Sequence, residues 1–342
     1  MAEKQKLEDV LKSLEKDYGK GAVLHGHVPS SEVEVIDTGS IGLNSALGVG
    51  GVPVGKIIEI FGWESSGKST LCQTIVGNAQ RKGIKCIYVD AENSIDASYS
   101  KALGMNLDDL YMIQMDESAG EGAYNKVDRL VETGEFGLVI YDSYNALQPK
   151  SVVEGEVGDS AIGKHARMLG QAVMKANYLA SKHNCTFIFI GQLREKIGVM
   201  YGSPQTTQGG NALKFYSHVR MEIVRSTTKD NSIMNGDQKL GNKVTIKVIK
   251  NKMGAPFTSA EIDVIYGVGF DKIGELVDMA KEEGIIKLRA GVVTYSDQKY
   301  KEEDFRSLIE DNPDFMNELK TKILNALSNP KKEVENESVN SV

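Results

Sequence analysis

Cysteine is scarce in this sequence. Only Cys72, Cys86 and Cys185 occur among 342 residues, far apart and without C-x-x-C spacing. All three lie in or beside apolar runs, which favours reduced, buried thiols over a disulfide framework or a cysteine metal site. Because disulfides persist mainly in oxidising compartments, the pattern predicts a cytoplasmic protein.

Long apolar runs are missing as well. No stretch approaches the roughly 18 residues that a membrane-spanning helix needs, and no charged-then-apolar leader opens the chain. We therefore expect neither secretion nor a membrane span.

An excess of positive charge is also absent. The 40 basic and 47 acidic residues leave a net charge of −7, which argues against a passive nucleic-acid coat, because such proteins are usually basic. Residues 301–342 contain ten acids and six bases, a local balance of −4. Net charge therefore leaves room for a basic channel elsewhere.

Hydrophobic periodicity predicts an α/β fold. Residues 3–18 form an amphipathic helix whose apolar stripe suits either its own core or a neighbouring subunit. From residue 56, continuous apolar strands alternate with helical segments: "KIIEIF", "IKCIYVDAE", "LVIYDS" and "TFIFIGQ". Such strands indicate a buried, mainly parallel central sheet with helices on both faces.

The pattern changes in the last third of the chain. Strands over 218–225, 242–251 and 259–266 have no long helix between them, so we expect an antiparallel flank on the sheet. We divide the chain into an N-terminal helix and linker (1–34), a core (35–268), a small C-terminal α+β domain (269–328) and a disordered tail (329–342).

A glycine loop, "FGWESSGKST", follows the first core strand and fits G-x-x-x-x-G-K-[ST]. Backbone N–H groups and the helix N-terminus after such a loop hold phosphates, Lys68 reaches the β- and γ-phosphates, and Ser69 binds Mg²⁺. We expect a nucleotide to contact Gly62, Glu64, Ser65, Ser66, Gly67, Lys68, Ser69 and Thr70.

Acidic residues end two neighbouring strands. Asp142 follows four apolar residues in "LVIYDS", at the edge of a parallel sheet where ligands bind, and would support Mg²⁺. Glu92 and Asp90, in "YVDAEN", both stand where a carboxylate could deprotonate an attacking water. Spacing alone leaves the choice between Glu92 and Asp90 open.

Several blocks are typical of one family. They are "DTGSIGLNSALGVGGVPVGKIIEIFGWESSGKST", "YVDAENSIDASY", "VIYDSYNAL", "EGEVGDSAIGKHARML", "GQLREKIGVMYGSPQTTQGGNALKFYSHVR" and "VIKNKMGAPF". In this order, from about residue 5 to 290, the chain closely resembles bacterial-type RecA recombinases. The resemblance implies a RecA-type P-loop NTPase core.

The resemblance also implies roles in ATP hydrolysis. Glu92, rather than Asp90, matches the catalytic glutamate, and Gln192 matches the glutamine that senses the γ-phosphate. Lys250 and Lys252 match lysines that reach a neighbouring subunit's nucleotide, so turnover would depend on polymerisation.

Around the base, Tyr99 matches the residue that stacks on adenine, with Asp96 nearby. The implied cofactors are ATP and Mg²⁺. The chain departs from the family pattern at five positions. Trp63 replaces a common proline, Ser69 a common threonine and Tyr144 a small residue, while Asn93 stands where histidine is frequent and Gly191 where asparagine is usual.

Two glycine-bearing stretches, about 155–163 and 193–208, match the family's DNA-binding loops. Their cations would track phosphates, and their apolar side chains would wedge between bases. The implied DNA-binding residues are Gly155, Glu156, Ile162, Arg167, Arg194, Lys196, Ile197, Met200, Tyr201, Gly209, Gly210 and Asn211.

The function implied is a DNA-dependent ATPase that forms helical filaments on single-stranded DNA and exchanges strands with double-stranded DNA in recombination, repair and the SOS response. Leu7, Leu11, Leu14 and Phe215 would form subunit interfaces. A LexA-type repressor and a single-strand-binding protein are candidate partners. Two rival functions use the same core: a filament scaffold for repressor self-cleavage and a ring-type ATPase or helicase.

Overall fold

The computed structural model describes residues 7–20, 22–23, 33–156, 163–195, 205–225, 232–236 and 238–328. The chain forms two compact units, Met1–Glu34 and Val35–Val342. The first unit contains helix α1 (Leu7–Tyr18), which confirms the predicted amphipathic helix. None of its residues is buried, and Leu7 is 73% exposed.

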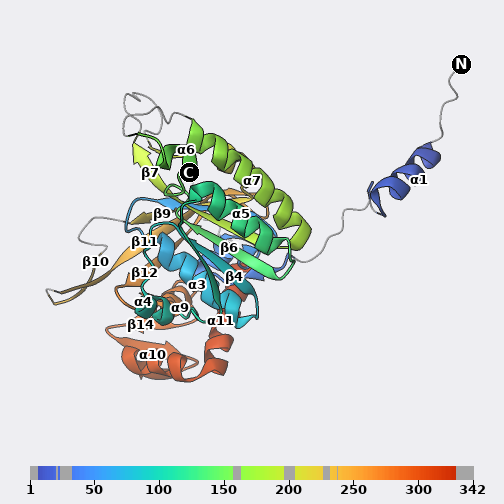
Figure 1. Cartoon of the computed structure of the whole chain (residues 1–342). Coiled ribbons are helices and arrows are strands. Elements are labelled where there is room, and N and C mark those ends of the chain that lie inside the picture. Colours follow the sequence, from blue (N-terminus) through green and yellow to red (C-terminus); the bar gives the residue numbers. More distant parts are fainter. Residues whose placement is uncertain are drawn as a thin grey trace, which may run out of the picture. The chain divides into compact units, whose positions relative to one another are not determined.

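All other elements belong to the second unit (Figure 1). The strands are β1 (Val35–Ile36), β2 (Val52–Pro53), β3 (Ile57–Gly62), β4 (Lys85–Asp90), β5 (Leu110–Gln114), β6 (Phe136–Asp142), β7 (Thr186–Glu195), β8 (Gln205–Thr207), β9 (Val219–Arg225), β10 (Ser232–Asn235), β11 (Gln238–Asn251), β12 (Thr258–Ile265), β13 (Gly269–Phe270), β14 (Lys287–Arg289), β15 (Val292–Tyr295) and β16 (Gln298–Lys301). The helices are α2 (Ile41–Ala46), α3 (Lys68–Arg81), α4 (Ala97–Ala102), α5 (Ala119–Val131), α6 (Lys150–Val153), α7 (Lys164–His183), α8 (Ala212–Tyr216), α9 (Lys272–Glu282), α10 (Glu302–Asp311) and α11 (Pro313–Ser328).

One large sheet organises this unit, with strand order β13-β12-β11-β9-β3-β7-β6-β4-β5. The strands from β9 to β5 pair in parallel, whereas β9, β11, β12 and β13 pair antiparallel. This arrangement confirms the predicted parallel centre with an antiparallel flank. Parallel neighbours need long crossovers, which the helices supply, and antiparallel neighbours need only short turns.

Alternation along the strands builds a core on each face of the sheet. Ile58 and Ile60 pack with α3 on one face, while Ile57 and Phe187 pack with α5 and α7 on the other. Figure 1 shows α5 and α7 running along one side of the central strands. The three cysteines are free and buried, as predicted.

A smaller lobe follows the sheet and has its own core. Helices α9, α10 and α11 and the antiparallel strands β14, β15 and β16 surround Phe305, Leu319 and Ile323. The predicted small C-terminal α+β region is therefore present (Figure 1). Its exact boundary stays a prediction, and residues 329–342 lie outside the described residues. Across the described ranges, every helix is too short or too polar to cross a bilayer.

Candidate functional site

The glycine loop lies between β3 and α3 and depends on two glycines. Gly67 has φ +96°, and a Cβ on Gly62 would lie 2.3 Å from the Ile223 carbonyl oxygen of neighbouring β9. Gly67 is also the N-cap residue of α3 and has no side chain with which to cap it. The N–H groups of the first turn can therefore receive an anion.

Lys68 and Ser66 give this loop the chemistry of a phosphate site. Burial lowers the pKa of Lys68, and Asp142 and Glu92 offset part of that shift. Its Nζ donates to the Trp63 carbonyl oxygen over 2.7 Å, so Trp63 faces Lys68 with its backbone. Ser66 Oγ is buried and has no hydrogen-bond partner among the described residues, and both Lys68 and Ser66 line a cavity of about 220 Å³. A buried Ser66 hydroxyl that lacks such a partner, beside the Lys68 ammonium group, fits a phosphate ligand.

Asp142 ends β6 beside the start of α3. Burial raises the pKa of its carboxyl, and hydrogen bonds from Tyr88 and Ser69 offset part of the shift. Tyr88 donates to Asp142 Oδ2 over 2.6 Å. The Ser69 hydroxyl and the Asp142 carboxylate, which are hydrogen-bonded, are suitable oxygen ligands for Mg²⁺. Water and phosphate oxygens usually complete the coordination of this ion. Within the described ranges, no cluster of three or more His, Cys, Asp or Glu side chains could hold a metal by itself.

Glu92 and Gln192 meet at this edge of the sheet. Glu92 Oε1 accepts hydrogen bonds from the Ser143 hydroxyl and, over 3.0 Å, from Gln192 Nε2. Asp90, by contrast, accepts from the backbone N–H groups of Ser94 (2.9 Å) and Ile95 (3.1 Å) and so holds a turn. The geometry favours Glu92 over Asp90 as the water-activating carboxylate. Sequence reasoning missed Ser143, although its place next to Asp142 was a usable signal.

The far side of the cavity contains Tyr99, whose hydroxyl lies 3.0 Å from Thr70 Oγ1. Asp96 caps α4 by accepting from the Tyr99 N–H over 2.7 Å, and the Ser98 hydrogen bond contributes most to lowering its pKa. Asp96 lies next to Tyr99 but does not line the cavity.

Three polar cavity residues from the antiparallel flank were missed: Arg225, Asn242 and Tyr266. Arg225 donates to the Ser65 carbonyl oxygen over 3.3 Å, and Asn242 donates to the Tyr266 hydroxyl over 2.5 Å. Arg225 is 160 positions away from Ser65. No local pattern could have revealed this contact.

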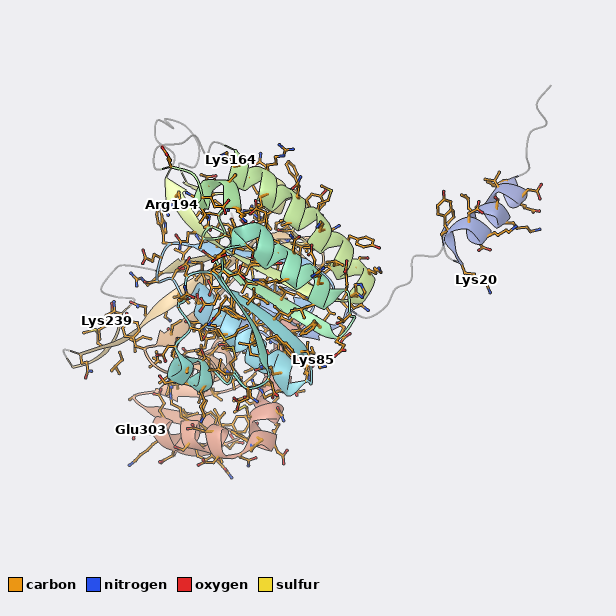
Figure 2. All side chains as sticks on the ribbon, viewed as in Figure 1. Lys20, Lys85, Lys164, Arg194, Lys239 and Glu303 are labelled. Atoms are coloured by element: carbon orange, nitrogen blue, oxygen red, sulfur yellow. The ribbon has the colours of Figure 1, made fainter. Side chains whose placement is uncertain are left out.

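The described candidate DNA-binding residues lie on or beside α6, α7, β7 and the β8–α8 connection. Gly155 and Glu156 follow α6, Arg167 lies on α7, and Arg194 lies near the end of β7; Gly209, Gly210 and Asn211 connect β8 to α8. Figure 2 shows Arg194 and Lys164, the first residue of α7, at the same end of the molecule. Ile162, Lys196, Ile197, Met200 and Tyr201 lie outside the described residues.

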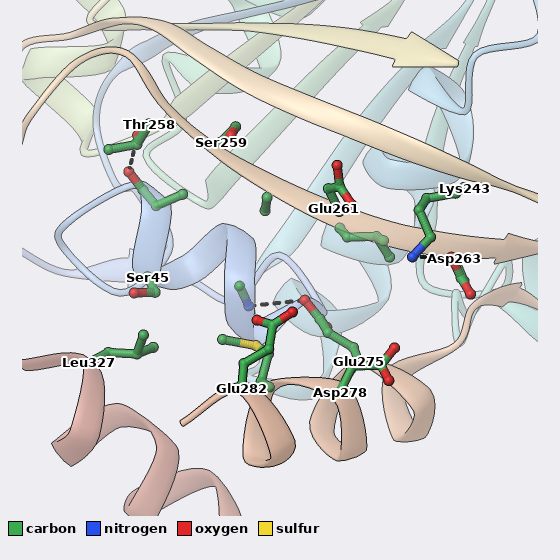
Figure 3. A pocket seen from close by; sticks show the side chains of 15 residues that line it. Ser45, Lys243, Thr258, Ser259, Glu261, Asp263, Glu275, Asp278, Glu282 and Leu327 are labelled. Carbon is green, nitrogen blue, oxygen red and sulfur yellow. Dashed lines mark hydrogen bonds and ion pairs between the residues drawn. The ribbon is translucent and has the colours of Figure 1, made fainter. Parts of the chain in front are cut away.

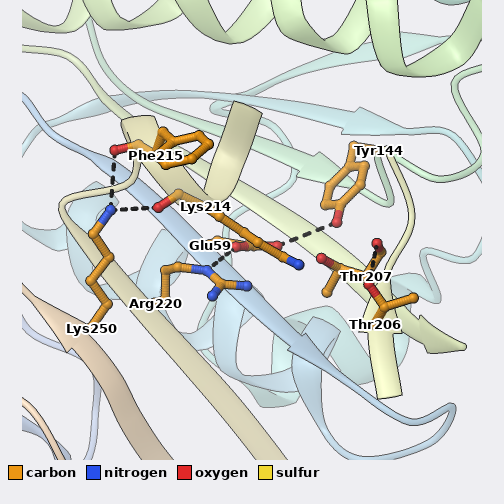
Figure 4. Close-up of polar contacts among 8 residues, drawn as sticks. All are labelled: Glu59, Tyr144, Thr206, Thr207, Lys214, Phe215, Arg220 and Lys250. Carbon is orange, nitrogen blue, oxygen red and sulfur yellow. Dashed lines mark hydrogen bonds and ion pairs between the residues drawn. The ribbon is translucent and has the colours of Figure 1, made fainter. Parts of the chain in front are cut away.

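Lys250, Lys252 and Phe215 do not line the nucleotide cavity of their own subunit. Lys250 Nζ donates to the carbonyl oxygens of Lys214 and Phe215, the latter over 3.1 Å (Figure 4). Burial, followed by the charge of Lys252, lowers the pKa of Lys250. Phe215 is 72% exposed.

A larger cavity, about 530 Å³, lies between α2, β12, α9 and α11 (Figure 3). Its charged lining consists of one cation, Lys243, and five acids: Glu261, Asp263, Glu275, Asp278 and Glu282. This acidic lining would repel a phosphate, so size does not identify the nucleotide site. Glu275 has a structural role there, because its carboxylate accepts hydrogen bonds from the Ser40 hydroxyl and from the N–H groups at the start of α2.

Comparison with known proteins agrees with this geometry. The model of the RecA N-terminal domain matches residues 5–271. Protein RecA of Paracoccus denitrificans is 45% identical over 327 residues, which cover 94% of this chain and 90% of that protein. Protein RecA of Clostridioides difficile is 42% identical over 320 residues, 93% of this chain and 90% of that protein. A family model that covers most of the chain, with relatives matched almost from end to end, places this protein in the RecA family.

Proposed function

We propose that this chain uses ATP and Mg²⁺ at the glycine loop to control a helical filament on DNA. As a RecA-family ATPase, the protein is a DNA-dependent ATPase that mediates homologous pairing and strand exchange. The observation that supports the residue assignments best is the hydrogen-bonded group of Glu92, Ser143 and Gln192. It connects a candidate general base to β7, the strand that leads into the second DNA-binding stretch.

In this proposal the chain's own residues divide the work. The N–H groups at the start of α3 and Lys68 bind the triphosphate, while Ser69 and Asp142 hold Mg²⁺. Mg²⁺, when bound, would neutralise charge on the transferring phosphoryl group. Glu92 would orient the attacking water and take its proton, and the hydrogen bond from Gln192 would hold the carboxylate in place.

Neighbouring subunits would complete the site. Lys250 and Lys252 do not line the cavity at their own glycine loop, which suits cations that act on an adjacent subunit's nucleotide. The unburied apolar stripe of α1, with Leu7, Leu11 and Leu14, would dock on an adjacent copy. Exposed Phe215 would contribute to the same kind of interface.

DNA would bind where the two glycine-bearing stretches meet the core. Arg167 and Arg194 supply charge for the phosphates, and Gly209, Gly210 and Asn211 let the backbone approach the strand closely. Sequence would be read by base pairing between strands. We place the protein in the cytoplasm, and a LexA-type repressor and a single-strand-binding protein remain candidate partners.

Lys68→Ala tests this proposal. Because the variant lacks the cation that faces the phosphates, ATP binding and joint-molecule formation should disappear together; fluorescent-nucleotide titration and a D-loop assay measure them. Lys85→Ala, which removes an exposed lysine paired with Glu135, is the matched control and should leave both unchanged. Full strand exchange by Lys68→Ala would refute the proposal. Electron microscopy separates the rivals, since closed rings indicate a helicase-like ATPase and filaments without exchange indicate a scaffold.

A further inference from the structure

Tyr144 occupies a junction that the proposed roles above do not use. It lies two positions after Asp142 and is fully buried. Its N–H donates to the Ile190 carbonyl oxygen of β7 over 3.1 Å, and His165 Nε2 lies 3.0 Å from its carbonyl oxygen. Its hydroxyl donates to Glu59 Oε1 of β3 over 3.4 Å. Through its backbone and its hydroxyl, this one residue therefore connects β3, β7 and the first turn of α7.

The ring of Tyr144 fits against a bare backbone. A Cβ on Gly191 would lie 2.6 Å from the Tyr144 hydroxyl oxygen and 2.8 and 2.9 Å from two ring carbons. Real Cβ atoms do not approach so closely, so the ring and any larger residue at 191 exclude each other. Gly191 immediately precedes Gln192 on β7, and the ring therefore limits where this part of the strand can lie.

Tyr144 borders the ends of both candidate DNA-binding stretches, the first through its backbone carbonyl and the second through its ring. His165 lies two residues after Gly163, where the first stretch ends. After the second stretch, a Cβ on Gly209 would lie 3.4 Å from Tyr144 Cε2 and 3.5 Å from His165 Cε1. The next residue, Asn145, accepts from the Gln192 N–H over 2.8 Å and donates to Gln208 over 3.4 Å.

Glu59 fixes the hydroxyl end of Tyr144. The Glu59 side chain is completely buried and pairs with Arg220 Nε (Figure 4). Arg220 in turn lies over the Phe61 ring at 4.8 Å. A buried carboxylate needs such partners to remain charged. Arg220 is also the β9 register partner of Lys250 on β11. The contacts of Tyr144 thus extend toward the residue proposed to act on the neighbouring subunit.

We propose that Tyr144 is a positioning residue that sets how strongly DNA stimulates ATP hydrolysis. Its ring packs on Gly191 and its hydroxyl bonds to Glu59. These contacts fix the position of the ends of both DNA-binding stretches relative to Gln192. A movement of either stretch on DNA therefore moves the Gln192 segment against Glu92. This inference rests on the proposed function, because it assumes that the two stretches bind DNA.

The central test is Tyr144→Phe, which keeps the ring and removes only the hydroxyl. Tyr124→Phe is the matched control, because the Tyr124 hydroxyl is also buried but has no hydrogen-bond partner in the part of the chain that the structure describes. We expect Tyr144→Phe to raise the single-stranded DNA concentration that half-saturates ATPase stimulation about fivefold, a typical size for coupling between two sites. DNA-free hydrolysis, ATP affinity and the thermal midpoint should match those of Tyr124→Phe.

A second pair of variants tests the ring. Gly191→Ala should weaken DNA stimulation further, because its methyl group collides with Tyr144, and Tyr144→Val combined with Gly191→Ala should recover part of the loss. Equal half-saturation in Tyr144→Phe and wild type would overturn the inference, as would a parallel loss of ATP affinity and thermal midpoint. If single-stranded DNA does not change the ATPase rate of the wild type, the proposed function itself is wrong.

Discussion

The edge of the sheet with the glycine loop and the C-terminal lobe differ in where their charged side chains lie. At the edge, Lys68 and Asp142 are buried, and burial shifts both of their pKa values toward the neutral form. In the lobe, Phe305 and Phe315 pack edge to face at 5.7 Å inside, while Lys322 and Glu318 pair at the exposed surface.

This contrast separates function from stability. Apolar residues would pack at this edge more favourably than Lys68 and Asp142, so these two buried groups with shifted pKa values fit a place that is arranged for a ligand. An aromatic interior with charges outside is what stability alone favours. Substitutions at the edge should therefore change turnover more than unfolding, and substitutions in the lobe should do the reverse.

The largest effect is expected for Glu92→Gln. Glutamine keeps an oxygen that can accept from Ser143 and Gln192 but cannot take a proton from water. ATP should still bind, turnover should fall by about 10²- to 10⁴-fold, and filaments should persist on DNA. A single-turnover ATPase assay measures this, with Glu117→Gln, an exposed acid, as control. Rapid hydrolysis by Glu92→Gln would remove Glu92 from the proposed role.

Phe305→Ala tests the C-terminal lobe, where we expect a substitution to change stability and leave ATP binding intact. Phe305 is fully buried and contacts the Tyr295, Tyr300 and Phe315 rings. Its truncation should lower the free energy of unfolding by about 3–5 kcal/mol, measured by urea denaturation, while ATP affinity stays near the wild-type value. Leu324→Ala, at a position 43% exposed on α11, should cost less than about 1 kcal/mol. Equal losses from both would contradict the assigned core.

The smallest effect is expected at Glu275, where the C-terminal lobe contacts the start of α2. Glu275 of α9 accepts hydrogen bonds from the Ile41 and Gly42 N–H groups over 3.2 and 3.0 Å, and burial raises the pKa of its carboxyl. The folded state thus holds this proton more tightly than the unfolded state does. The contribution of Glu275 to stability is complete below pH 4.5, its ordinary pKa, and is lost as pH rises through the higher folded value.

We expect the thermal midpoint of the wild type to fall above pH 4.5, and Glu275→Gln should flatten that fall. Glu261→Gln is the matched control, because Glu261 lines the same cavity but is exposed. A slope unchanged by Glu275→Gln, or changed equally by both variants, would show that another group titrates.

Much of the fold and part of the site could be predicted from local pattern. The glycine loop, Asp142 and the candidate base lie just after apolar strands, and parallel strands bring such ends to one edge. The choice of Glu92 over Asp90 came only from resemblance, and the turn that Asp90 holds now gives it a structural reason. Tyr88 could not be predicted to hold Asp142, because its side chain looks like any strand residue until β4 and β6 pair.

By itself, the sequence determined the elements, their period and the chemistry at each strand end, because these depend on neighbours along the chain. Only the tertiary structure decided which distant residues touch. Arg225 reaches Ser65 because β9 lies beside β3, and the bare face of Gly191 receives Tyr144 because β6 lies beside β7. Strand order is a property of the whole sheet, and hydrophobic alternation along one strand does not specify it.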